Sequence, residues 1–213
     1  MPKLHLFLIL SLFAACQNSQ QGASTVPEST APQISTADTA IVGREMAAKE
    51  KQVANLGQQL SIIPIRSKAE KDELKNPDNG IMPWFTIDSA QQKIANLIDP
   101  DELVLSYQKV KIMFDYPLAK PIFLELTSLT KGFTRKQIIL AISKKYHEIY
   151  EEEEKTAKTK TIPLKDRKKL ANRNETDGKY GIWGHDLSDL DLDDIIVHQT
   201  SDGSIVLELD IES

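Results

Sequence analysis

The chain has 213 residues but only one cysteine, and aromatic residues make up just 6% of it. A single cysteine excludes a disulfide-stapled scaffold and any zinc or iron–sulfur site that needs several thiolates. Ten prolines and nine glycines are too few for a collagen-like or wholly disordered chain. The net charge of −5 and the scarcity of aromatic side chains argue against nucleic acid as a partner. The length allows one ordinary domain with additional segments.

The N-terminal segment is apolar but short. Lys3 precedes an apolar stretch at residues 4–13. As a helix this stretch would be about 15 Å long, half of the hydrocarbon thickness of about 30 Å. It is therefore too short to span a membrane and has the composition of a secretory signal. No later apolar run approaches the length of about 18 residues expected for a membrane-spanning helix.

Two alanines and the only cysteine follow this stretch. Ala14-Ala15-Cys16 resembles the lipobox of bacterial lipoproteins, in which small residues precede a cysteine that is lipidated and becomes the mature N-terminus. Phe13 departs from the pattern, because leucine is usual at that position. The resemblance covers residues 1–16 and implies a signal peptide at 1–15, a lipid on Cys16 as the membrane anchor, and a place in the bacterial cell envelope facing the periplasm or the exterior. The alternative is ordinary signal cleavage, which would leave Cys16 as a free thiol in a secreted protein.

Residues 16–80 read as a tether. Glutamine, serine, threonine, alanine and proline dominate residues 17–43, and such a composition buries too little apolar surface to offset the entropy of ordering. Residues 44–60 carry a weak helical spacing of apolar side chains, interrupted by Gly57. The run Asn-Pro-Asp-Asn-Gly at residues 76–80 is a strong turn signal. We therefore expect the folded domain to occupy residues 81–213.

The pattern in this domain predicts an α+β fold: a small antiparallel sheet with one main covering helix. Residues 110–114 and 122–126 alternate between apolar and polar side chains and are close enough in sequence to form an antiparallel pair. Thr134 and Gln137 form a capping-box pattern at the start of a helix. An apolar stripe continues along that helix: Ile138, Ile142, Tyr146 and Ile149.

A C-terminal hairpin is also expected, and its register can be argued. A two-residue turn at Asp202-Gly203 would place Leu207 opposite His198, whereas a three-residue loop places Leu207 opposite Val197. The second register opposes apolar side chains. Because a slip of one residue moves every side chain to the other face, we predict the three-residue loop with Gly203 in the left-handed conformation.

One glycine-rich segment, residues 178–186, could carry function. It resembles neither a phosphate-binding loop nor a dinucleotide fingerprint, so we expect no cofactor. One interpretation is a structural loop in which Trp183 fills the core. The other is a binding surface in which Tyr180, Trp183 and His185 contact a glycan or peptide, because aromatic side chains with a polar edge are good contact residues.

Two further chemistries are open. His185 and Asp186 could act as an acid/base pair, although the sequence offers no nucleophile motif beside them. Asp189, Asp191 and Asp193 have the spacing that opens a calcium-binding EF-hand loop, but Asp194 and Thr200 stand where glycine and glutamate are needed. We therefore expect no metal site, with these aspartates as a weak alternative.

Together these features predict a cell-envelope lipoprotein with a non-catalytic binding or structural domain, whose partner is the membrane and an envelope glycan or protein. The alternative is a hydrolase of envelope polymer or glycan, with His185 and Asp186 as its acid/base groups.

Overall fold

The computed structural model describes residues 43–44, 47, 56–70, 80–167 and 173–213. The expected signal peptide, the lipobox with Cys16 and most of the expected tether lie outside the described residues. Gly43, Arg44 and Ala47 are helical, but residue 58 already begins a strand. The helix expected over residues 44–60 therefore ends earlier than its sequence pattern suggested.

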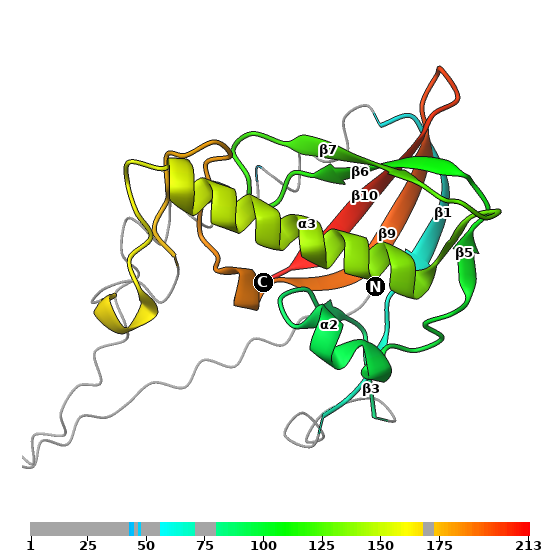
Figure 1. Ribbon diagram of the computed structural model, residues 1–213, viewed down its shortest axis with the longest axis horizontal. Coiled ribbons are helices and arrows are strands. Elements are labelled where there is room, and N and C mark those ends of the chain that lie inside the picture. The colour runs from blue at the N-terminus through cyan, green and yellow to red at the C-terminus, as the bar shows by residue number, and fades with distance from the viewer. Residues whose placement is uncertain (1–42, 45–46, 48–55, 71–79, 168–172) are drawn as a thin grey trace, which may run out of the picture. The chain divides into compact units, whose positions relative to one another are not determined.

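A six-stranded sheet forms the centre of the α+β fold. Its main strands lie in the order β1-β9-β10-β6-β7, and β4 pairs with β9 beside this path (Figure 1). The bounds are β1 Gln58–Pro64, β4 Phe85–Thr86, β6 Lys109–Phe114, β7 Ile122–Thr127, β9 Asp191–Gln199 and β10 Ile205–Glu212. The pairing of β10 with β6 is parallel, so the sheet is mixed and the expectation of an antiparallel sheet is wrong at this one junction.

The domain starts before residue 81. β1 pairs with β9 over its whole length, and Ile63 and Ile65 belong to the hydrophobic core. The boundary expected near Ile81 is therefore too late. The sequence did not indicate this strand, because it ends in Pro64 and charged residues follow. Proline is tolerated here because β1 is an edge strand, where not every backbone N–H has to pair within the sheet.

The hairpin β9–β10 has the register expected from its apolar pattern. Leu207 lies opposite Val197 and Leu209 opposite Ile195, and Gly203 has φ = 84°. β6 and β7 form the expected antiparallel pair. These four apolar side chains of the hairpin are all buried. A slip of one residue would turn them to the other face of the sheet, so their burial specifies the register.

The long helix α3, Arg135–Thr156, lies across one face of the sheet in Figure 1. It begins with the expected capping box: the Thr134 side chain accepts from the Gln137 N–H, and the Gln137 side chain accepts from the Thr134 N–H. Its apolar stripe is buried, and the ring of Tyr146 meets that of Phe114 on β6 edge to face, with centroids 5.0 Å apart. The Tyr146 hydroxyl also donates to the backbone oxygen of Tyr116 at 2.8 Å.

Short elements complete the fold. They are the helix α2 Ala90–Lys93, the 3₁₀ turns η1 Ile94–Asn96, η2 Leu164–Asp166 and η3 Leu187–Asp189, and the two-stranded pairs β2 Ser67–Lys68 with β3 Ile81–Met82 and β5 Leu103–Leu105 with β8 Phe133–Thr134. None of the helices in the described part of the chain is both long enough and apolar enough to cross a lipid bilayer.

Candidate functional site

The glycine-rich segment is packed into the domain. The exposed fractions of Tyr180, Trp183 and His185 are only 3%, 6% and 5%. Trp183 contacts the ring of Tyr116 edge to face at 5.3 Å, and His185 packs against the same tyrosine at 5.6 Å. The three side chains are thus core residues in this structure, and the interpretation of them as an exposed contact surface is wrong.

A buried glutamate of α3 holds this segment in place. The carboxylate of Glu153, which is fully buried, accepts a hydrogen bond from the Thr176 hydroxyl at 2.7 Å and from the N–H groups of Gly178, Tyr180 and Gly181 at 2.8, 2.7 and 3.1 Å. Burial by itself would raise the pKa of Glu153, but these hydrogen bonds outweigh it and hold the pKa below its usual value.

The glycine at position 178 is required by this contact. A Cβ atom there would lie 2.7 Å from the Glu153 backbone oxygen and from its carboxylate. Only glycine lets the backbone approach the carboxylate so closely. Glu153 belongs to the Glu151–Glu154 run, whose other members are wholly or partly exposed.

The structure places His185 and Asp186 in different contacts. The Asp186 carboxylate forms an ion pair with Arg167 at 2.7 Å and faces Arg173 at 3.7 Å. The His185 Nε2 atom lies 3.4 Å from the Ser213 hydroxyl instead. Each side chain therefore serves a separate structural contact, and the buried His185 has little access to a substrate.

The three aspartates of the calcium alternative also serve separate roles. Asp189 accepts from the Asp186 N–H at 2.8 Å, and Asp191 begins β9. Burial, followed by the charges of Glu212, Asp210 and Asp194, raises the pKa of Asp193 to about 6. Within the described ranges, no group of three or more histidine, cysteine, aspartate or glutamate side chains is arranged so that it could hold a metal ion.

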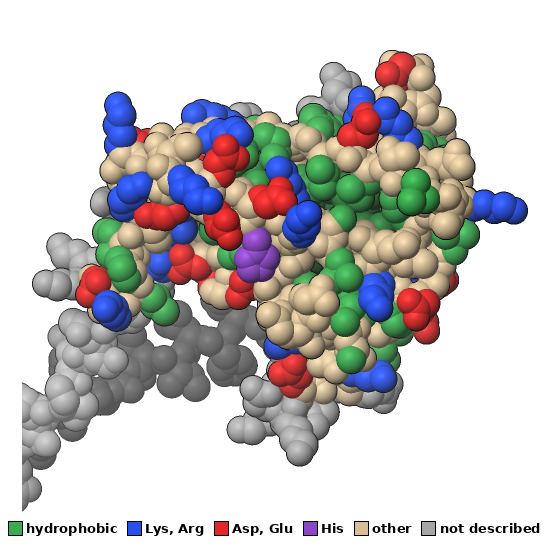
Figure 2. Space-filling view, viewed as in Figure 1, with side chains coloured by type: hydrophobic (Ala, Val, Ile, Leu, Met, Phe, Trp, Pro, Cys, Tyr) green, Lys and Arg blue, Asp and Glu red, His purple; other side chains and the backbone are tan. Residues whose placement is uncertain are grey.

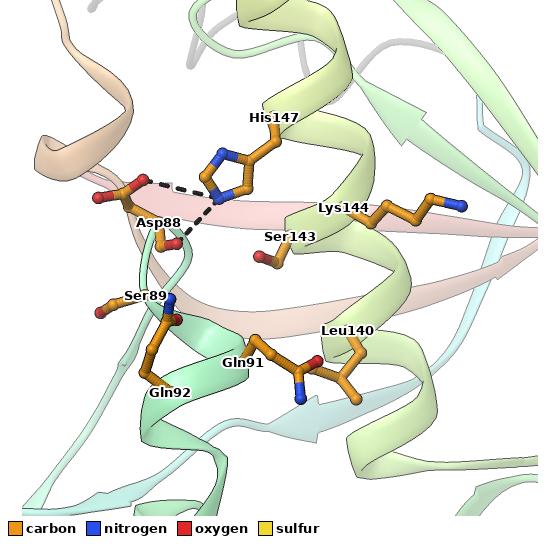
Figure 3. A pocket seen from close by; sticks show the side chains of 8 residues that line it. All are labelled: Asp88, Ser89, Gln91, Gln92, Leu140, Ser143, Lys144 and His147. Carbon is orange, nitrogen blue, oxygen red and sulfur yellow. Dashed lines mark hydrogen bonds and ion pairs between the residues drawn. The ribbon is translucent and has the colours of Figure 1, made fainter.

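A pocket between α2 and α3 is a better candidate site, and sequence reasoning missed it. Its volume is about 300 Å³. Figure 3 shows the side chains around it, which come from α2, from the two residues before it and from α3: Asp88, Ser89, Gln91, Gln92, Leu140, Ser143, Lys144 and His147. The α3 residues recur at intervals of three and four, so they share one face of the helix.

Several polar groups line this pocket, and one of them is held in place by a neighbour. The His147 ring nitrogen Nε2 lies 2.9 Å from the backbone oxygen of Asp88 and 3.6 Å from its carboxylate, which fixes the imidazole against the α2 end (Figure 3). The remaining amide and hydroxyl groups can both donate and accept hydrogen bonds.

In comparisons with protein-family models, with curated proteins and with solved structures, no significant match to this chain was found.

Proposed function

We propose that this protein is a bacterial cell-envelope lipoprotein whose α+β domain is a non-catalytic binding module. In this proposal residues 1–15 are the signal peptide, Cys16 carries the lipid, and the chain between Cys16 and β1 is the tether. The lipobox pattern Ala14-Ala15-Cys16 supports the anchor. In this proposal α3 covers the sheet with its apolar face, and another face of the same helix lines the pocket together with α2.

The observation that carries the binding role is the pocket between α2 and α3. Its lining combines amides, hydroxyls, one imidazole, one ammonium group and the carboxylate of Asp88 with a single aliphatic side chain, Leu140. Such a set suits a neutral ligand rich in hydroxyl groups, because each amide and hydroxyl can pair with a hydroxyl in either direction. We therefore propose an envelope glycan as the ligand.

The hydrolase alternative has weaker support. Its acid/base residues, His185 and Asp186, are engaged in the contacts described above, with Asp186 paired to Arg167. In the pocket itself, Asp88 engages the ring nitrogen of His147. A bound glycan would find hydrogen-bonding groups there.

The test is binding of purified cell-wall glycan strands to the full chain. Gln92→Ala removes one amide from the pocket and should weaken binding about tenfold, the effect of about 1.4 kcal/mol. Gln59→Ala, on the exposed part of β1, is the matched control and should bind like the unaltered protein. Equal binding by all three proteins, or none, would contradict the glycan site, and release of new reducing ends during incubation would favour the hydrolase.

A further inference from the structure

Strand β7 forms an exposed edge of the sheet and has neither a bulge nor a proline within its bounds. Among the described residues it pairs only with β6, and the six pairs from Ile122 to Thr127 run without a register shift. The opposite edge differs, because β1 contains a bulge between Gln59 and Ser61 and ends at Pro64. Bulges and prolines discourage pairing with another chain, and a long regular edge invites it. The β1 edge therefore discourages pairing with another strand, whereas the regular β7 edge permits it.

The free edge presents a defined set of backbone groups. The Ser128 N–H donates to the Gln108 oxygen next to β6, at 2.8 Å. Because N–H and C=O groups alternate between the two sides of an antiparallel strand, those of Phe123, Glu125 and Thr127 point away from β6. A partner strand would therefore meet three donors and three acceptors in a regular row.

An apolar groove lies beside this edge, on the α3 side of the sheet. A pocket of about 440 Å³ is lined by the end of β7, the turn after it and the first turns of α3, with Leu126, Leu129, Phe133 and Ala141 as its apolar residues. Figure 2 shows hydrophobic side chains gathered between α3 and β7 on this face. Ile122, Leu124 and Leu126 are only partly buried against the core. This face of β7 therefore retains apolar surface for a neighbour.

From these features we infer that β7 is the interface of a symmetric dimer, and that a second copy of this chain occupies the edge. Side chains directly opposite each other must lie on the same face of the sheet, so the twofold axis must pass beside a residue. Placed at Leu124, the axis sets Ile122 opposite the second copy's Leu126 and Phe123 opposite its Glu125. The partly buried aliphatic side chains then form one continuous layer.

The neighbouring symmetric register is disfavoured by charge. With the axis at Glu125, two carboxylates of like charge would lie directly opposite each other. With the axis at Leu124, Glu125 has no charged opposite and keeps its ion pair with Lys109 at 2.8 Å. Thr127 then faces Pro121, whose C=O can accept the threonine N–H but which has no N–H to donate to the Thr127 oxygen. The register with its axis at Leu124 therefore avoids the like-charge pair.

The first experiment measures the mass of the full chain in detergent by light scattering. A dimer is expected. Glu125→Pro removes an outward-pointing N–H without touching the ladder to β6, so it should convert the dimer to a monomer while the melting temperature stays close to that of the unaltered protein. Glu125→Thr keeps the N–H and is the matched control, which should remain dimeric. A monomeric mass for the unaltered chain at all concentrations would overturn the inference. The same holds if the edge binds a strand of another protein and the chain itself stays monomeric.

The second experiment maps the register by disulfide trapping and does not depend on the proline variant. In a chain carrying Cys16→Ser, Leu124→Cys places the only thiol beside the axis and should give a covalent dimer on mild oxidation. Thr127→Cys places two thiols about 20 Å apart in this register and should give none. Trapping of Thr127→Cys in place of Leu124→Cys, or of neither, would overturn the register and the interface.

Discussion

At the scale of single residues, the most consequential side chain is Glu153. It continues the apolar stripe of α3, because it lies four residues after Ile149, and this spacing was the one signal in the sequence that it is buried. Its charge and its place among four glutamates pointed to solvent instead. The structure shows the reason for the exception: four donors from residues 176–181 converge on one carboxylate. These donors lie more than twenty residues away, beyond the reach of local patterns.

Glu153→Gln should destabilise the domain. The glutamine NH₂ group would replace one carboxylate oxygen and would face the N–H and O–H donors that now bind that oxygen. About 3 kcal/mol should therefore be lost from the free energy of unfolding at pH 7. The lowered pKa of Glu153 stabilises the folded state above the usual glutamate pKa, and this contribution is lost as the pH falls through the lowered value. Urea unfolding should therefore show the difference between the two proteins shrinking in acid. The exposed Glu151→Gln should change stability by about 0.5 kcal/mol at most, and a similar loss in both variants would contradict the role of Glu153.

Asp193 should have the opposite pH dependence. Its pKa is raised to about 6, and its Oδ1 atom is buried without a hydrogen-bond partner in the described structure. Its contribution to stability is therefore fully present below the usual aspartate pKa and is lost as the pH rises through about 6. After allowance for solvent screening, Asp193→Asn should stabilise the protein by about 1 kcal/mol at pH 8 and by nothing measurable at pH 4. Melting temperatures at the two pH values test this, and a loss of stability at pH 8 would refute it.

At the scale of elements, the sequence predicted what local rules determine. The capping box of α3, the β6–β7 pair and the register of the β9–β10 hairpin all depend on residues close together in the chain, and all three are confirmed. The parallel pairing of β10 with β6 and the joining of β1 to β9 link distant segments. The pocket between α2 and α3 was missed for the same reason, because Asp88 and His147 meet only through the fold.

The start of α3 offers a test at this scale. Thr134→Ala removes the acceptor for the Gln137 N–H, at 3.3 Å, and should cost about 1 kcal/mol of stability. Thr134→Ser keeps the hydroxyl and should cost much less. Chemical denaturation of the three proteins would reveal the difference, and equal losses in both variants would mean that the threonine methyl group matters more than its hydroxyl.

At the scale of the whole molecule, the proposed anchor and the domain are separable. If Cys16 carries the lipid, Cys16→Ser should move the protein from the detergent phase to the aqueous phase, since the described helices offer no membrane span. The domain should remain folded, because β1 and every later strand lie far from Cys16 in the sequence. Phase partitioning and circular dichroism measure the two properties, and unchanged membrane association of the variant would exclude the lipid as anchor.

The central position of β10 has a consequence for how the protein is made. β10 lies between β9 and β6 in the sheet, yet it follows every other strand in the sequence. While the ribosome is still adding β10, the β6–β7 pair has no neighbour on its inner side, and a two-stranded pair alone is only marginally stable. The central sheet therefore cannot be completed until synthesis has passed residue 212.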